Sequence, residues 1–264
     1  MTDRVHILVS VLALTLIGVP AAHAQMADDP LSADRPGFGT GATTMASGTA
    51  QSELGYQFTS AAQSNHSFGQ LLLRYGVTDR FEVRANIGSY GLQEQSAGLV
   101  GSDTEFEGGY NGAAIEAKAQ ISQTETTTAS LFSATTVPLG SGPFASSDDR
   151  ARQTLALLLD GALGQTITLS VNAGANFYWS SGVQDDRFVT GLFIPTLSFV
   201  VNDETSAYVG YSGEYTEFDN TNYVEGGLTY LLNNDTQLDV NTGLRLDDTP
   251  ETEFFLGLGL AHRF

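Results

Sequence analysis

Serine and histidine lie close together at one place in the chain, where Ser64 and Ser67 flank His66. A serine hydroxyl becomes a nucleophile when a histidine within hydrogen-bond reach takes its proton, so this group could serve hydrolysis. A histidine in an outer loop is the simpler interpretation, and we predict that the protein is not an enzyme. A lipid hydrolase embedded in a membrane is the enzymatic alternative.

Carboxylates occur as adjacent pairs in three polar segments, at Asp148-Asp149, Asp185-Asp186 and Asp247-Asp248. Such oxygens could bind calcium or bridge lipopolysaccharide through divalent cations. Solvated loop charge is the favoured interpretation. Metal sites need clustered ligands, and the two histidines beyond the N-terminal segment, His66 and His262, are predicted at opposite ends of the protein. We expect no metal and no cofactor.

A larger set of charged residues occupies alternating positions within apolar segments. If those segments are strands, these side chains share the polar face, where they could line a pore and select ions or solutes. Because both signs occur, they could equally pair with one another and fill the interior. The members of this pore-lining set are Arg74, Glu82, Arg84, Glu116, Lys118, Asp160, Glu225, Asp239 and Arg245.

Composition limits both the partners and the elements that position these residues. The 264 residues carry a formal net charge of −19, and Lys118 is the one lysine, so nucleic acid is excluded as a partner. Glycine occurs 29 times and aromatic residues make up 10% of the chain, a bias toward strands and tight turns. The chain has no cysteine, so no disulfide framework holds it together.

From residue 49 onward, apolar and polar residues alternate with period two, as in strands that have one polar face. We predict an all-β protein: a transmembrane, antiparallel, up-and-down β-barrel of about 12 strands. The runs are 49–60, 67–77, 80–90, 111–122, 126–138, 153–164, 166–179, 187–201, 204–216, 222–232, 236–247 and 252–264.

The links between the runs alternate in length. Tight links such as "VTDR" and "LNND" follow the even-numbered runs, whereas longer polar links such as "LGSGPFASSDDRAR" generally follow the odd-numbered ones. All tight turns therefore lie at one end of the sheet. Outer-membrane barrels have this asymmetry, with short periplasmic turns and longer extracellular loops.

The apolar face of each run carries no charge. In the third run that face consists of Phe81, Val83, Ala85 and Ile87. A charge facing lipid at the bilayer centre costs about 2–4 kcal/mol for Arg or Lys, so this exclusion indicates that the apolar face contacts hydrocarbon. The eighth run is apolar on both faces and contains Pro195; a bulge, or packing of the N-terminal leader against it, would explain this pattern.

The N-terminus has the features of an export signal followed by an irregular leader. Residues 1–24 contain Arg4, an apolar run too short to span a bilayer, and the motif Ala22-His23-Ala24, which predict a cleaved signal peptide. Residues 25–48 have no strand period, and within them Asp34-Arg35-Pro36-Gly37 could plug the lumen or belong to a loose linker. The barrel is predicted to occupy residues 49–264.

The last run ends at an aromatic residue, Phe264. Its apolar face consists of Phe254, Leu256, Leu258, Leu260 and Phe264. This tail resembles the C-terminal signal of outer-membrane barrels, which implies the barrel-assembly machinery as a partner. His262 departs from the pattern, which usually has a hydrophobic or aromatic residue there.

Two further segments, "ADRPGFGTG" and "LRYGVTDRFEVR" (Leu73 to Arg84), together with the terminal phenylalanine, resemble the outer-membrane transporter family labelled "putative meta-pathway of phenol degradation". The resemblance implies an outer-membrane barrel that admits aromatic or other small hydrophobic compounds. The residues themselves show no site for an aromatic compound.

We therefore predict a passive channel for small solutes in the outer membrane of a Gram-negative bacterium, with outer-membrane lipid and lipopolysaccharide as its surroundings. A structural barrel without an open pore is the main alternative.

The lipid-facing surface leads to a first testable prediction. The mature polypeptide should be monodisperse only in detergent or lipid, because its outer girth is apolar. Size-exclusion chromatography with and without detergent measures this. A monodisperse species in plain buffer, or labelling all round its girth by a water-soluble reagent, would contradict the membrane barrel.

Overall fold

The computed structural model of the protein describes residues 29–95, 105–144, 151–179, 187–216, 220–247 and 253–264. The predicted signal peptide lies outside these residues, as do the acidic pairs at 148–149 and 185–186. The described residues form thirteen β-strands and one short 3-10 helix, η1 (Gly142–Phe144). No helix among them is long and apolar enough to cross a membrane.

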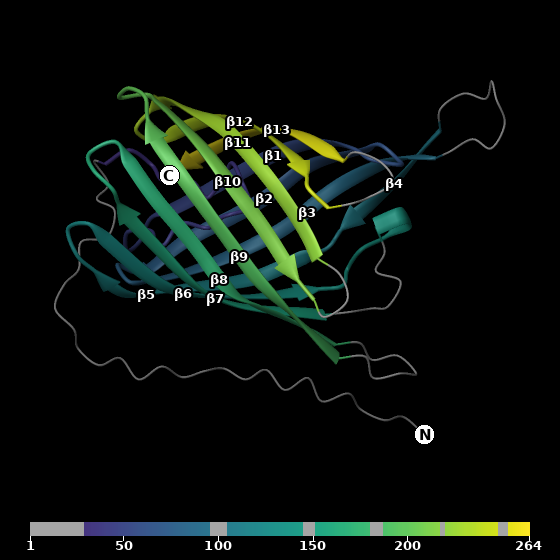
Figure 1. Cartoon of the computed structure of the whole chain (residues 1–264), viewed down its shortest axis with the longest axis horizontal. Helices are drawn as coiled ribbons and strands as arrows, with labels where there is room; N and C mark the ends of the chain where they lie inside the picture. Colours follow the sequence, from purple (N-terminus) through teal and green to yellow (C-terminus); the bar gives the residue numbers. More distant parts are fainter. Residues whose placement is uncertain (1–28, 96–104, 145–150, 180–186, 217–219, 248–252) are drawn as a thin grey trace.

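Twelve of the strands form a closed antiparallel barrel (Figure 1). The ring closes where β1 (Ala50–Ser60) pairs with β13 (Phe254–Arg263). The predicted fold class is therefore confirmed. The other barrel strands are β2 (Asn65–Thr78), β3 (Phe81–Gln95), β5 (Ala113–Gln123), β6 (Thr127–Val137), β7 (Ala151–Ala162), β8 (Ile167–Trp179), β9 (Arg187–Val200), β10 (Thr205–Tyr215), β11 (Asn220–Asn233) and β12 (Thr236–Arg245).

One additional strand, β4 (Glu105–Asn111), was not predicted, because its residues fall in the long link after the third run. It pairs with Ser89–Gln95 of β3, whereas Phe81–Asn86 of the same strand pairs with β5. The change of partner is possible because Gly88 and Gly112 adopt φ values of +79° and +54°, in a region that glycine tolerates. β4 and β5 thus follow one another along a single edge of β3.

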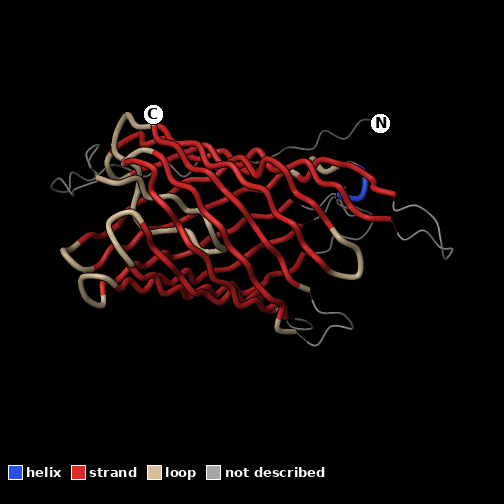
Figure 2. Tube along the Cα trace, turned by 90° about the horizontal axis from the view of Figure 1, so that it is seen from above, coloured by secondary structure: helices blue, strands red, loops and turns tan. Residues whose placement is uncertain are grey.

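The strand ends divide the barrel into two dissimilar ends. The amide of Arg263 donates to the carbonyl of Asp235 in the β11–β12 turn, and the amide of Phe264 donates to the carbonyl of Ala50. The C-terminus therefore lies at the end that carries the short turns, called the turn end below. The longer links lie at the opposite, loop end, and the strands cross obliquely between the two (Figure 2).

The side chains alternate between outside and inside in the predicted phase. On the outside, Ile115 and Leu258 expose 72% and 51% of their surface. On the inside, Glu53, Glu82 and Lys118 are fully buried. The outer surface is therefore suited to hydrocarbon, and ionisable groups are confined to the enclosed side.

β2 begins before the predicted strand and contains a bulge. Gly69 and Gln70 have φ values of +97° and +33°, and the register with β3 shifts between Phe68 and Leu71. The interpretation of His66 as a loop residue was wrong, since it lies within β2, where its ring is 5.1 Å from that of Phe58 and 5.8 Å from that of Phe106.

The doubly apolar strand β9 is explained by the leader. Its pairing with β8 runs through Pro195 without a register shift, so the strand contains no bulge at this point. Ile194 points inward and is 6% exposed, and a Cβ atom built on Gly39 of the leader would lie 3.7 Å from its side chain. The leader therefore lies against the inner face of β9 at Ile194, and Leu192 of the same face lines the cavity described below.

The confinement of charge to the interior predicts a specific cost at the lipid face. Leu258→Arg, at an outward position in β13, should lower the free energy of unfolding by about 2–4 kcal/mol, because the guanidinium would enter hydrocarbon. Urea titration in lipid vesicles measures this loss. Leu139→Arg is the matched control: Leu139 is similarly exposed, at 56%, but follows β6 in a link at the loop end. Equal losses at the two positions would contradict the assignment of the lipid face.

Candidate functional site: a leader inside the lumen

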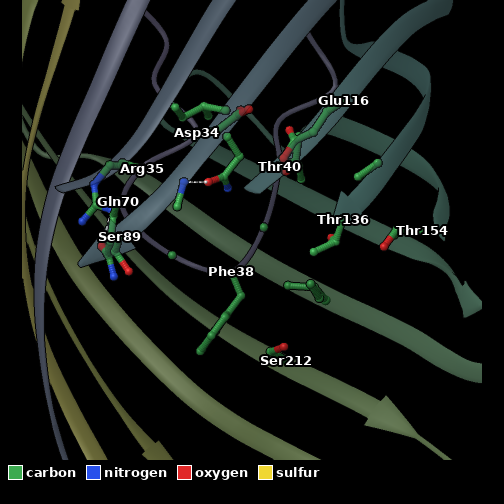
Figure 3. A pocket seen from close by; sticks show the side chains of 18 of the residues that line it. Asp34, Arg35, Phe38, Thr40, Gln70, Ser89, Glu116, Thr136, Thr154 and Ser212 are labelled. Carbon is green, nitrogen blue, oxygen red and sulfur yellow. Dashed lines mark hydrogen bonds between the residues drawn. The ribbon is translucent and has the colours of Figure 1, made fainter. Parts of the chain in front are cut away.

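The described part of the leader, residues 29–48, forms a loop inside the barrel (Figure 3). It starts at the turn end, where the amide of Leu31 donates to the carbonyl of Asn234 at 2.7 Å. It returns to the same end, where the amide of Gly48 donates to the carbonyl of Gly76 at 2.8 Å. Ala42 and Met45 are fully buried between these points. The leader therefore packs the lumen on the side of the short turns.

The leader has no regular structure, so its backbone N–H groups need acceptors from elsewhere. Inward carboxylates of the wall supply them. Glu53 accepts from the amide of Arg35, Glu225 from that of Phe38, Asp160 from that of Ala42 and Glu82 from that of Met45, at 2.9, 2.8, 2.7 and 2.9 Å. Four strands thus fix the path of the leader through its backbone.

The side chain of Asp34 enters a cluster of three buried cations, called the basic cluster below: Arg74 of β2, Arg84 of β3 and Lys118 of β5. Asp34 Oδ2 accepts a hydrogen bond from Arg84 and lies 3.6 Å from Lys118 Nζ, and Asp34 Oδ1 lies 3.9 Å from Arg74. Because the three cations come from three strands, one leader carboxylate links them all.

Carboxylates of the wall complete this network. Arg74 pairs with Glu53 at 3.0 Å and with Glu82 at 2.7 Å. Arg84 pairs with Glu116 at 2.8 Å. All of these side chains are at most 9% exposed, so removal of one partner would leave an uncompensated buried charge, which typically costs about 3–5 kcal/mol.

The cations also control the ionisation of Asp34. Burial opposes the charged form, but Arg74, Lys118 and Arg84 outweigh that effect and hold the pKa of this carboxyl well below its usual range. The amide of Gly41 adds a hydrogen bond of 3.0 Å to Oδ1. Asp34 is therefore an anion at all ordinary pH values.

A cavity of about 680 Å³ lies against the leader within the barrel. Phe38 projects from the bend of the leader (Figure 3), and its ring lies 5.4 Å from that of Tyr223 and 5.5 Å from that of Phe255. Polar residues of the wall, among them Asn176 and Glu214, line the cavity as well. A space of this size would hold a small organic molecule.

The sequence-predicted pore-lining residues fall into three groups. Five of them form the basic cluster with its wall carboxylates: Arg74, Glu82, Arg84, Glu116 and Lys118. Asp160 and Glu225 hold amides of the leader, and Asp239 lies 3.7 Å from the guanidinium of Arg35. Arg245 stands apart from these and pairs with Asp247 and Glu253, which flank the β12–β13 link at the loop end.

The other candidate residues do not come together in a site. Tyr56 Oη lies 2.9 Å from Nδ1 of His66, and the hydroxyl of Ser67 pairs with that of Ser89, so neither group belongs to a serine–histidine pair. Asp247 of the third acidic pair is bonded to Asn222 and Arg245. No group of three or more metal-ligating side chains exists within the described residues.

The predicted C-terminal signal lies on the outer surface. Its five members expose between 38% and 76% of their surface: Phe254, Leu256, Leu258, Leu260 and Phe264.

The sequence reasoning missed two contacts of the leader. Asn172 of β8 binds Thr40 twice, accepting from its amide at 2.7 Å and donating to its carbonyl at 2.8 Å. Its inward phase in a clear strand could have indicated this role. Phe38 had no such signal, because the leader lacks any period from which an orientation could be inferred.

Comparison with known proteins identifies the family. A family model described as "Putative MetA-pathway of phenol degradation" matches residues 33–264. The chain belongs to this family. A search of curated proteins finds no match.

Solved structures share the fold of this family member. The COG4313 outer membrane channel from Pseudomonas putida F1 superposes with a TM-score of 0.65 at 17% sequence identity, over 84% of this chain and 97% of that one. The NanC porin gives 0.56 at 9% identity, over 80% and 98% of the two chains. The KdgM porin in complex with disordered oligogalacturonate gives 0.53 at 8% identity, over 80% and 99%. These likenesses show an outer-membrane barrel fold.

The two segments by which the sequence resembles the phenol-degradation family meet in space. Asp34 belongs to the first segment, and the second segment, Leu73 to Arg84, contributes Arg74, Glu82 and Arg84 to the network around it. The resemblance therefore falls on the residues that join leader and wall.

This network predicts the behaviour of an Asp34→Asn variant. The neutral amide would leave the basic cluster without one of its anions, and breaking a buried ion pair typically costs about 3–5 kcal/mol. The leader should therefore detach more often, and its backbone amides should exchange with solvent at least about tenfold faster. Hydrogen exchange of residues 31–48 in detergent measures this. Asp247→Asn, which removes a carboxylate at the loop end, is the control and should leave the leader protected.

The pH dependence follows from the same contacts. A lowered folded-state pKa makes the contribution of Asp34 fully present above the unfolded value, about pH 4, and lost only as pH falls through the folded value. Protection of the Gly41 amide, which Asp34 holds, should thus persist in the wild type from pH 7 down to about pH 4. Loss of protection of this amide near pH 6 would contradict this account of the anchor.

Proposed function

We propose that the protein is a passive channel for small solutes, closed at rest by its own leader. The proposal is supported by the way in which the leader fills the lumen. The barrel wall is a continuous ring of strands, but the lumen is filled at the turn end by a segment without strand structure, held by side-chain contacts. Such a segment can leave its place without breaking the barrel ladder, since few backbone hydrogen bonds join it to the wall.

The path would begin in the cavity and continue past the leader. Residues on the cavity side include Arg84, Glu116 and Glu225, and Lys118 lies beneath the leader, where its Nζ donates to the carbonyl of Thr43. Movement of the leader would bring all of these charges into the path. The residues that the sequence predicts to line the pore would therefore line it in the open state.

We propose the outer membrane of a Gram-negative bacterium as the site of action. The apolar outer surface supports this, as does the fold shared with outer-membrane channels. The exposed face that ends in Phe264 would be read by the barrel-assembly machinery, and lipopolysaccharide would surround the loop end. A small aromatic or hydrophobic compound is the proposed solute class, supported by the family description and by the 41% exposed ring of Phe38 at the cavity.

A barrel without an open pore is the second candidate. The burial of Met45 in the leader and of Lys118 in the wall favours it, because neither side chain has any exposed surface. Planar-bilayer recording of the refolded protein separates the two functions: discrete conductance steps support the channel, and a silent, correctly folded protein supports the sealed barrel.

Substitution in the basic cluster tests the path itself. Arg84→Ala and Lys118→Ala each remove one fixed positive charge, so reversal potentials in a salt gradient should shift toward cation selectivity. Arg245→Ala removes the same charge from the wider loop end and should shift the potential less. Unchanged reversal potentials in the first two variants would remove both residues from the conducting path.

A further inference from the structure

Three neighbouring strands on one side of the cavity carry an aromatic surface with a carboxylate at the same level. Glu225 of β11 stands opposite Gly243 of β12, which in turn stands opposite Phe255 of β13. A Cβ atom on Gly243 would come within 2.4 Å of the Phe255 ring, so that ring lies over the glycine, toward Glu225. Tyr223 is two residues before Glu225 on the same face of β11.

The leader completes this surface. The ring of Phe38 contacts those of Tyr223 and Phe255, and the amide of the same residue donates to Glu225 Oε1 at 2.8 Å. Although Phe38 is inside a polar lumen, 41% of its surface is exposed toward the cavity. An exposed aromatic ring gains from contact with another ring or with a cation placed over its face.

Glu225 lacks a cationic partner in the part of the chain that the structure describes. It is 3% exposed and accepts hydrogen bonds from two neutral donors, the amide of Phe38 and, at 3.3 Å, the hydroxyl of Tyr208. The carboxylates of the basic cluster, by contrast, each pair with a guanidinium. A buried carboxylate held by neutral donors alone is unfavourable, and an approaching cation would relieve that cost.

A second acceptor lies close by. Asn241 of β12 lines the same cavity and is 7% exposed, and its Oδ1, which lies over Gly257 of β13, accepts no hydrogen bond from any described residue. This section of wall therefore presents acceptors next to aromatic rings. An ammonium group has three donors and no acceptor, whereas a carboxylate would meet Glu225 with like charge.

The guanidinium groups near this wall are already engaged. Arg84 binds Asp34 and Glu116, and Arg35 donates to Gln70 and to the carbonyl of Leu258. These two guanidinium groups are therefore paired within the described residues, and Arg152, which also lines the cavity, belongs to β7 and not to this wall.

We propose that the cavity contains a binding site for a small aromatic ammonium ion. The ring of the ligand would pack against Phe38, Tyr223 and Phe255, and its ammonium group would donate to Glu225 and Asn241. The inference rests on the proposed function only in that solutes must enter the lumen, and it narrows the solute class by charge.

Three probes of nearly equal size test this site in the full mature protein in detergent: benzylammonium, benzyl alcohol and benzoate. Isothermal titration against protein, with protein-free micelles subtracted, should give benzylammonium an affinity about tenfold or more above that of the other two, from cation–π and carboxylate contacts. An equal or higher affinity for benzyl alcohol or benzoate in the wild type would overturn the proposal without any variant.

Two substitutions locate the site. Glu225→Gln keeps an acceptor for the leader amide but removes the charge, so the preference for benzylammonium should fall to within about twofold of benzyl alcohol. Phe38→Leu, which lies in the leader and leaves the wall intact, should weaken both benzylammonium and benzyl alcohol by several-fold, about the loss expected for an aromatic contact.

The matched control is Glu214→Gln. Glu214 lines the same cavity from β10, where Asn176, Tyr178 and Thr190 hold it, so this variant removes an equal charge from the same space. It should retain most of the wild-type preference. If Glu214→Gln and Glu225→Gln lowered the preference for benzylammonium equally, the preference would come from the overall negative charge of the cavity and not from a defined site. That result would overturn the proposal. Preferential binding of benzylammonium without conductance would support the binding site and refute the channel. Conductance without preferential binding would support the channel and refute the binding site.

Discussion

Three cations buried in a membrane barrel set the main constraint on this structure. Arg74, Arg84 and Lys118 cannot face lipid, and within a narrow lumen they need anions at close range. The wall supplies Glu53, Glu82 and Glu116, but the cations come from three different strands, and Asp34 of the leader reaches all three at once. This one anion joins the leader to three strands, and the wall carboxylates that accept its backbone amides hold the rest of its path.

The same constraint separates the two surfaces of the wall. Hydrocarbon outside excludes charge, while the leader inside requires acceptors for its backbone amides, so carboxylates and amides recur at inward positions of β7, β8 and β11. Some of the inward apolar residues of the described wall are covered by the leader. Ile194 is the clearest example, since it sits against Gly39 and makes β9 apolar on both faces. A lumen without this leader would have no use for an inward isoleucine at that level.

The wall could be predicted from the sequence because its signal is local. The alternation of apolar and polar residues determines which side chains share a face of a strand. The alternation of short and long links determines which strand ends lie at the same end of the barrel. The strand positions and the inward direction of Arg84 and Glu116 therefore followed from a few neighbouring residues each. β4 and the bulge at Gly69–Gln70 could not be predicted, because a change of strand partner or register depends on glycine conformations that no alternation records. For the leader, the sequence left a plug and a loose linker as alternatives, because Phe38 and Asp34 take their places from tertiary contacts alone.

In the proposed channel, charge balance in the lumen would differ between the closed and open states. With the leader in place, Asp34 compensates the basic cluster, while Asp160 and Glu225 accept amide hydrogen bonds from it. If the leader withdraws, the cations lose one anion and these carboxylates lose neutral donors, so both are left to water and to the passing solute. The residues that hold the leader in the lumen would therefore also determine the selectivity of the open channel. A substitution of one of these residues would change both how firmly the leader is held and which solutes pass once it has moved.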